Sequence, residues 1–263
     1  MSVRFTRDPE RPHVGRLRID LDELNLLTAE RARDLQEHVL DVPDEIAVLT
    51  IEADPSEVEA DGEIRGLSAG LNLEWARDLG PREGQELLEA LYETIEAVRN
   101  LDAVVICGCG SYTLGAGLEL AMACEFRVAT ADATLGLPEV NIGLPTVIHG
   151  GLLTRLVGHG TANELIYTGE TISGKRAVEI GLVNRAAPPA EYDATLEELV
   201  SSVASKGSNV LQTQKRVMRR FQSTGLERGT ESSIGDMGRV FGTDEQREAM
   251  DAFLEDREPN FER

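Results

Sequence analysis

The 263-residue sequence predicts an α/β fold that ends in a helical extension. Two observations predict it. The first half alternates β-rich apolar runs with amphipathic helical stretches, a pattern typical of a sheet covered by helices. From about residue 151 onward the pattern is mostly helical, and no Pro- or Gly-rich linker separates the two parts. We therefore expect one core over residues 1–190 and a helical C-terminal region over residues 191–263.

The elements of the first half follow from periodicity and capping. Residues 28–40 predict a helix with Thr28 as its N-cap, because a threonine hydroxyl can accept a free N–H of the first turn. Residues 84–99 repeat leucine, isoleucine and valine at helical spacing. The other expected elements are a helix over residues 115–124 and strands over residues 13–21, 46–52, 103–107 and 126–130.

Two connecting segments separate these elements. Residues 53–63 are polar and acidic, and residues 108–117, GCGSYTLGAG, are expected to connect a strand to a helix. The helices of the second half are expected over residues 152–158, 161–169, 173–181, 191–205, 208–223 and 243–255.

The composition indicates a protein with a sizeable aliphatic core. Hydrophobic residues make up 41% of the chain and aromatic residues only 4%. No run approaches the ~18 apolar residues of a membrane span, and the charged N-terminus lacks the apolar stretch of a signal peptide. The three cysteines lie in apolar contexts and do not suggest a disulfide framework, and the four histidines lie too far apart for a metal site. We expect a cytoplasmic protein that binds neither membrane nor metal.

The charge balance is strongly acidic. The chain carries 47 Asp and Glu against 26 Lys and Arg, a formal charge of −21, and only three lysines. Diffuse negative charge suits a protein kept soluble at high salt, so we expect a halophilic source. A nucleic-acid partner is disfavoured, because affinity for phosphate backbones depends on clustered Lys and Arg.

Two glycine-bearing stretches could bind an anionic group. Residues 108–117 fail the dinucleotide fingerprint, because Thr113 or Leu120 stands at the third glycine position. Ser111 fails the G-x-S-x-G elbow, because cysteine and threonine occupy its glycine positions. Free N–H groups near residues 115–117 and 69–71 could instead hold an oxygen that becomes negative during a reaction. The alternative is that these glycines serve only the turns in which they lie.

Longer stretches resemble a known family. LGAGLELAMACEFRVATADATLGLPEVNIGLP resembles the signature region of the crotonase (enoyl-CoA hydratase/isomerase) superfamily. RGLSAGLNLEW, LNLLT and AMDAFLEDREPNF are similar to other segments of that family and occur in the family's order. The resemblance spans residues 14–261 and implies a crotonase-type spiral core of repeated β-β-α units with a helical C-terminal extension. It also implies that residues 1–190 bind an acyl-CoA and that residues 191–263 mediate oligomerisation.

The resemblance implies a set of site residues. The backbone N–H groups of Leu71 and Ala116 would form an oxyanion hole, and Glu119 and Glu139 would be the catalytic acid and base. Glu139 lies in an apolar stretch, which favours a raised pKa for a carboxyl group. The surrounding positions would bind substrate or coenzyme A: Ala69, Gly70, Asn72, Leu73, Glu74 and Gly115.

Several positions depart from the family pattern. Asn72 replaces an aspartate and Glu74 replaces a lysine near the adenine, so we name Arg65 and Arg257 as candidates to hold the coenzyme phosphates. His149 lies ten residues after Glu139. A lone histidine is more often a packing residue than a catalyst, but one that faces the acyl chain would indicate specialised chemistry.

The expected function is hydration of a 2-enoyl-CoA to a 3-hydroxyacyl-CoA. The alternatives are double-bond isomerisation or another acyl-CoA reaction of the superfamily. A binding protein is the alternative from another class, and the net charge of −21 speaks against nucleic acid as its ligand. No cofactor is expected beyond the coenzyme A of the substrate. A homotrimer or a dimer of trimers is the expected assembly.

Overall fold

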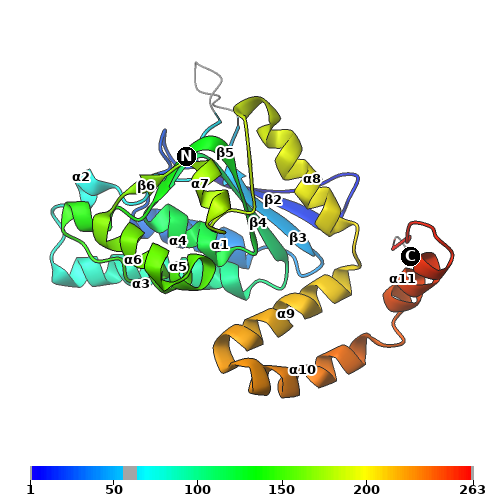
Figure 1. The fold of residues 1–263 in the computed structure, drawn as a ribbon. Helices are drawn as coiled ribbons and strands as arrows, with labels where there is room; N and C mark the ends of the chain where they lie inside the picture. Colours follow the sequence, from blue (N-terminus) through cyan, green and yellow to red (C-terminus); the bar gives the residue numbers. More distant parts are fainter. Residues whose placement is uncertain (1, 56–63, 262–263) are drawn as a thin grey trace.

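The computed structural model describes residues 2–55 and 64–261 (Figure 1). Its sheet has seven strands in the order β1-β2-β3-β4-β5-β6, with β7 also paired to β5. β2, β3, β4 and β5 are parallel neighbours, whereas β1 is antiparallel to β2. The strands are β1 (Ser2–Arg7), β2 (Val14–Asp20), β3 (Val48–Ala53), β4 (Val104–Leu114), β5 (Phe126–Gly136), β6 (Thr171–Ile172) and β7 (Arg185–Ala187).

Helices follow or separate these strands. The first group is α1 (Ala29–Leu40), α2 (Leu73–Ala76), α3 (Pro81–Asn100), α4 (Ala116–Ala123), the 3-10 helix η1 (Glu139–Ile142), α5 (Gly150–Val157), α6 (His159–Thr168) and α7 (Gly174–Glu179). The second group is η2 (Pro189–Glu191), α8 (Tyr192–Ala204), α9 (Ser208–Thr224), α10 (Leu226–Val240) and α11 (Asp244–Leu254). The fold is the expected α/β core with C-terminal helices.

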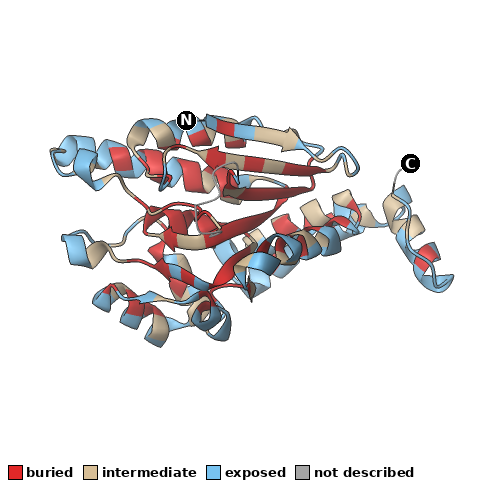
Figure 2. Ribbon diagram, turned by 90° about the horizontal axis from the view of Figure 1, so that it is seen from above, coloured by how far each residue is buried: buried red, intermediate tan, exposed pale blue. Residues whose placement is uncertain are grey.

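The sheet is buried on both faces. Leu49 and Ile51 of β3 belong to the main apolar cluster, which also holds side chains of α1, α3 and α4. Val48 of β3 points to the opposite face, because side chains alternate along a strand, and joins Tyr192 and Leu196 of α8 in a second cluster. Figure 2 shows the buried strands between the helices. The sheet therefore provides the rigid support from which the site loops extend.

Most of the expected elements of the core are confirmed, with one clear correction. Thr28 caps α1, and its hydroxyl accepts the N–H of Arg31. The expectation that residues 108–117 are a connecting segment was wrong, because β4 continues to Leu114. Its pairing with β5 shifts register on both sides of Gly110, whose φ is +62°. These irregularities let a glycine-rich strand bend and still resume pairing with β5.

The sequence analysis missed β1, α10 and several short elements, among them α2, β6 and β7, and one expectation is only partly described. β1 lies in the charged N-terminus, where Val3 and Phe5 pair with β2. Their alternation with polar residues is the signal that could have found it. α10 was not expected because three glycines, Gly229, Gly235 and Gly238, lie within it, and glycine disfavours a helix interior. The expected acidic loop, residues 53–63, lies largely outside the described residues, which resume at position 64.

The last three helices form an arm that stands away from the sheet (Figure 1). α8 packs on the sheet and α9 contacts the edge of the core, so the part of the predicted C-terminal region that stands free of the core begins at α10. Lys215 attaches α9 to the core, since its buried Nζ donates to Ala103 O at 2.7 Å and lies 3.0 Å from Glu125 Oε2. Phe253 and Leu254 are 86% and 80% exposed. In the described part of the chain, no helix combines the length and the apolarity of a membrane crossing.

Candidate active site

α4 presents a buried carboxyl group. All residues of α4 are buried, and Glu119 is 3% exposed. Glu119 Oε1 accepts a hydrogen bond from the His149 backbone N–H at 2.8 Å. Burial is the main reason that the pKa of Glu119 is raised to about 7; N–H hydrogen bonds from His149 and Gly150 oppose the rise, and the charge of Glu139 adds to it. Glu119 therefore changes protonation state near neutral pH, as a general acid or base requires.

The second carboxyl group lies across from the start of α4. Glu139 is the first residue of η1 and is half-buried. Its Oε2 accepts a hydrogen bond from Thr146 Oγ1 at 2.9 Å. A Cβ atom placed on Gly115 would lie 3.3 Å from Glu139 Oε1, so this carboxyl group lies directly beside the residue that precedes α4. The structure thus brings together the two glutamates that the sequence singled out.

Two glycine turns meet beside these carboxyl groups. Gly70 and Gly115 have φ of +92° and +53°, a region that favours glycine. A Cβ atom on Gly115 would lie 3.8 Å from Gly70 Cα, so the two turns are in contact. Each glycine precedes one of the predicted oxyanion donors, Leu71 or Ala116. The left-handed turns therefore set the direction of these two N–H groups.

Both N–H groups are available to a ligand. Leu27 bonds to the residues on either side of Leu71: its N–H donates to Gly70 O at 2.8 Å, and its carbonyl accepts the N–H of Asn72 at 2.9 Å. In this pairing the Leu71 N–H points away from Leu27. Within residues 2–55 and 64–261, neither the Leu71 nor the Ala116 N–H donates to a backbone or side-chain acceptor. Two adjacent free donors are what an oxyanion hole needs.

The flanking predicted residues build the first of these turns. The Ala69 N–H donates to Leu24 O at 2.9 Å. Asn72 caps α2, and its Oδ1 accepts the Trp75 N–H at 3.0 Å. Asparagine and aspartate are comparable N-caps, so the departure from the family's aspartate preserves this local role. Leu73 and Glu74 lie exposed on α2, next to the turn.

That two arginines hold coenzyme phosphates stays a prediction, and the structure shows what each guanidinium group contacts. Arg65 is 6% exposed, and its guanidinium donates to Asp20 Oδ1 at 3.0 Å and Asn25 Oδ1 at 3.2 Å. Arg257 pairs with Glu248 at 2.6 Å and with Glu255 at 2.7 Å, beyond α11. Both guanidinium groups are thus engaged by acceptors of the chain itself.

The side chain of His149 does not contact either glutamate of the site. Its Nε2 lies 2.8 Å from Glu96 Oε1, and its ring stacks on Tyr92 with centroids 5.6 Å apart. His149 thus lies where a packing residue would, in a buried contact with α3. Thr146 is a site residue that the sequence did not reveal, because its partner Glu139 becomes its neighbour only through the turn of η1.

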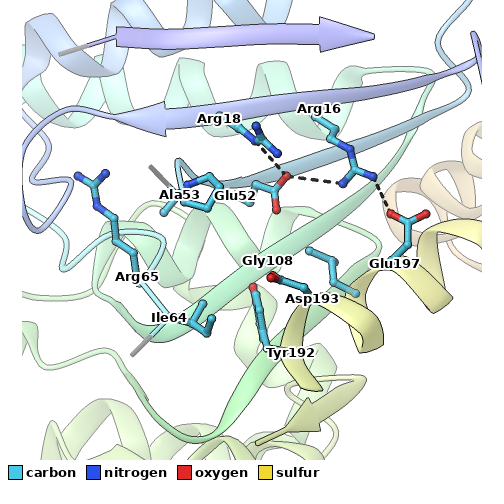
Figure 3. Close-up of a pocket in the computed structure, with 12 residues that line it drawn as sticks. Arg16, Arg18, Glu52, Ala53, Ile64, Arg65, Gly108, Tyr192, Asp193 and Glu197 are labelled. Atoms are coloured by element: carbon cyan, nitrogen blue, oxygen red, sulfur yellow. Dashed lines mark hydrogen bonds and ion pairs between the residues drawn. The ribbon is translucent and has the colours of Figure 1, made fainter. Parts of the chain in front are cut away.

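A cavity of about 370 Å³ lies on the α8 side of the sheet (Figure 3). Glu52 lies in it between Arg16 and Arg18, at 3.8 Å and 3.7 Å. Burial raises the pKa of Glu52 against the pull of these arginines. Neither Glu119 nor Glu139 lines this cavity, so it is separate from the candidate active site.

Comparisons with known proteins identify a family. A sequence model of the Enoyl-CoA hydratase/isomerase family matches residues 60–263. The crotonyl-CoA hydratase of Syntrophomonas wolfei is 31% identical over 244 residues, which cover 90% of each chain. The short-chain-enoyl-CoA hydratase of Clostridium acetobutylicum is 30% identical over 213 residues, which cover 76% of this chain and 81% of that one.

Solved structures share the whole fold. The enoyl-CoA hydratase of Mycobacterium smegmatis superimposes with a TM-score of 0.88 at 26% identity, and 99% of each chain is covered. That of Bacillus anthracis gives a TM-score of 0.87 at 27% identity and covers 98% of each chain. The family match, the relatives at 30% identity or more and the shared fold lead to one conclusion: this chain belongs to the enoyl-CoA hydratase/isomerase family, within the crotonase superfamily.

Proposed function

We propose that this protein hydrates a 2-enoyl-CoA to a 3-hydroxyacyl-CoA. The observation that carries the proposal is the convergence of two carboxyl groups, Glu119 and Glu139, on the two glycine turns that precede free N–H donors. Hydration needs both parts: two groups that exchange protons with one water, and donors that stabilise the enolate. The names of relatives, crotonyl-CoA hydratase and short-chain-enoyl-CoA hydratase, support the same reaction.

Each group has one role in this mechanism. The thioester oxygen lies between the N–H groups of Leu71 and Ala116, which stabilise its negative charge as the enolate forms. Ionised Glu119 takes a proton from water while the oxygen of that water bonds to Cβ. Glu139 takes up a proton from solvent and gives it to Cα, and Glu119 then returns its proton to solvent. The pKa of about 7 lets Glu119 act as this base near neutral pH. The reaction needs no metal or redox cofactor, and coenzyme A enters as part of the substrate.

The experiment compares single and double glutamine variants. Glu119→Gln and Glu139→Gln should each lower kcat for a short 2-enoyl-CoA by ~10²–10⁴-fold, because each removes one proton transfer. The double variant should lose much less than the product of the two factors, because both groups act on one water. Glu89→Gln changes an exposed glutamate of α3 and should leave kcat unchanged. Full activity in either site variant would refute the proposal.

Isomerisation is the second candidate, and one relative favours it by name. The enoyl-CoA isomerase/hydratase of Mycosarcoma maydis is 30% identical over 195 residues. Isomerisation moves one proton between Cα and Cγ, which a single base can do. Turnover of a 3-enoyl-CoA that survives Glu119→Gln but not Glu139→Gln would favour isomerisation over hydration.

The C-terminal helices support a self-associating assembly. α9 to α11 carry exposed apolar side chains, among them Leu226 at 77%, Ile234 at 67% and Phe253 at 86% exposure. Exposed apolar surface of this kind is typical of interaction sites. We therefore retain the homotrimer, or a dimer of trimers, as the proposed state.

A further inference from the structure

The segment between η1 and α5 has one buried anchor. Residues 141–148 are exposed or half-buried, whereas His149 is 6% exposed. The imidazole lies against α3, where it stacks on Tyr92 with an interplanar angle of 11°. Its Nε2 lies 2.8 Å from Glu96 Oε1. His149 is therefore the fully buried side chain of this segment, next to Ile148, which is half-buried and also packs against the core.

Glu96 is suited to hold the imidazole in one orientation. Burial alone would raise the pKa of Glu96, but hydrogen bonds from His149 and Arg99 lower it overall. An ionised carboxylate only accepts hydrogen bonds, so Nε2 carries the hydrogen in this contact. Nδ1 is buried and has no hydrogen-bond partner among the described residues. The contact with Glu96 is therefore the polar interaction that orients the ring.

The anchored segment contacts both glutamates of the site. The His149 N–H donates to Glu119 Oε1 at 2.8 Å, and the Thr146 hydroxyl donates to Glu139 Oε2 at 2.9 Å. These donors lie three residues apart, so a shift of the segment moves both together. The backbone position of His149 is thus linked to the protonation equilibrium of the buried carboxyl group.

We propose that His149 is a positioning residue: its ring, held by Glu96 and Tyr92, fixes the backbone N–H that binds Glu119. It acts through its main chain, and its imidazole does not touch the substrate. The kinetic consequence rests on the proposed hydration, but the titration of Glu119 does not. The charged groups that face this arrangement are Glu96 and Arg99 of α3, Glu119 of α4 and Glu139 of η1.

The direction of the effect follows from the hydrogen bond. The N–H of His149 stabilises the ionised carboxylate and so lowers the pKa of Glu119 against the effect of burial. Loosening that N–H should therefore raise the pKa. His149→Ala removes both ring contacts, whereas His149→Phe can retain the stacking on Tyr92 and loses only the Glu96 contact. The titration midpoint should rise in both variants, and further in the alanine variant.

The test measures this midpoint directly. The carbon-13 resonance of the Glu119 carboxyl group, assigned by its absence in Glu119→Gln, is titrated in wild type and in both variants. We expect a rise of roughly half a pH unit or more in His149→Ala, the scale of a weakened N–H donor to a carboxylate. His159→Ala, a change at an exposed histidine at the start of α6, is the control and should give the wild-type midpoint.

The outcomes separate this inference from the proposed function. A wild-type midpoint in His149→Phe would overturn the positioning role, whatever reaction the protein catalyses, and this variant decides the matter if the alanine variant fails to fold. In a hydratase, the acidic limb of the kcat profile should move upward with the midpoint, so that activity recovers at high pH. A merely structural role would lower kcat equally at every pH.

Discussion

Replacing Glu119 by glutamine should stabilise the folded protein at pH 8. The pKa of this carboxyl group rises from its ordinary value of 4.5 to about 7 on folding. Between these values the native state binds a proton that the unfolded state has released, so stability falls as pH rises. A difference of one between the folded and unfolded pKa values corresponds to ~1.36 kcal/mol. Ionised Glu119 therefore costs on the order of 3 kcal/mol of folding stability above pH 7. Glutamine keeps an acceptor for the His149 N–H and avoids this cost.

Urea unfolding at constant molar salt and constant protein concentration measures the difference between variant and wild type. The difference should be close to zero below about pH 4.5 and should grow to its full value by pH 8. Glu89→Gln removes the same charge from an exposed position and is the control for net charge. A difference that stays flat with pH, or one in which wild type becomes the more stable protein as pH rises, would refute the reasoning.

Three further predictions concern the glycine turns, the charge and the arm. Gly115→Ala forces alanine to a φ of +53° and brings Cβ to 3.3 Å from Glu139 Oε1, so it should destabilise the fold by about 1–2 kcal/mol and lower kcat. The control is Gly84→Ala in α3: a Cβ atom there has no neighbour within 4 Å, so this change should not destabilise the fold. The protein has a formal charge of −21, so its thermal unfolding midpoint should fall as salt is reduced from molar to millimolar, because repulsion between its acidic residues is then unscreened. A midpoint that does not change with salt would contradict this. Light scattering at molar salt should give a mass near three or six times 28.7 kDa, and a monomer alone would exclude the proposed assembly.

The sequence predicted best where a local pattern and the tertiary packing agree. α1 has a capping threonine and a regular apolar stripe, and β3 is an uninterrupted β-rich run, so each could be read from its own residues. β4 could not, because its second half contains glycines that usually end a strand and here form bulges. α10 could not be read either, because its three glycines are poor helix formers and favour a loop assignment.

The sequence led to the two candidate catalytic residues but not to the contacts that support them. Glu119 and Glu139 were found from a resemblance, which gives positions in the chain but not contacts. Thr146, and the contact between Glu96 and His149, depend on how the segment after η1 folds back over α3 and α4. The partners of Arg65 could not be read from the sequence either, because Asp20 and Asn25 lie 40 or more residues earlier in the chain.

The contact between Gly70 and Gly115 has a consequence for how the chain acquires its activity. The two turns are 45 positions apart, and α2, α3 and β4 lie between them. Contacts across such a separation form late, because the loop between them must first be closed at the cost of its entropy. A nascent chain that has emerged only as far as α3 therefore contains the first N–H donor without its counterpart. During refolding, helical circular dichroism should return before the protein regains its affinity for an enolate analogue.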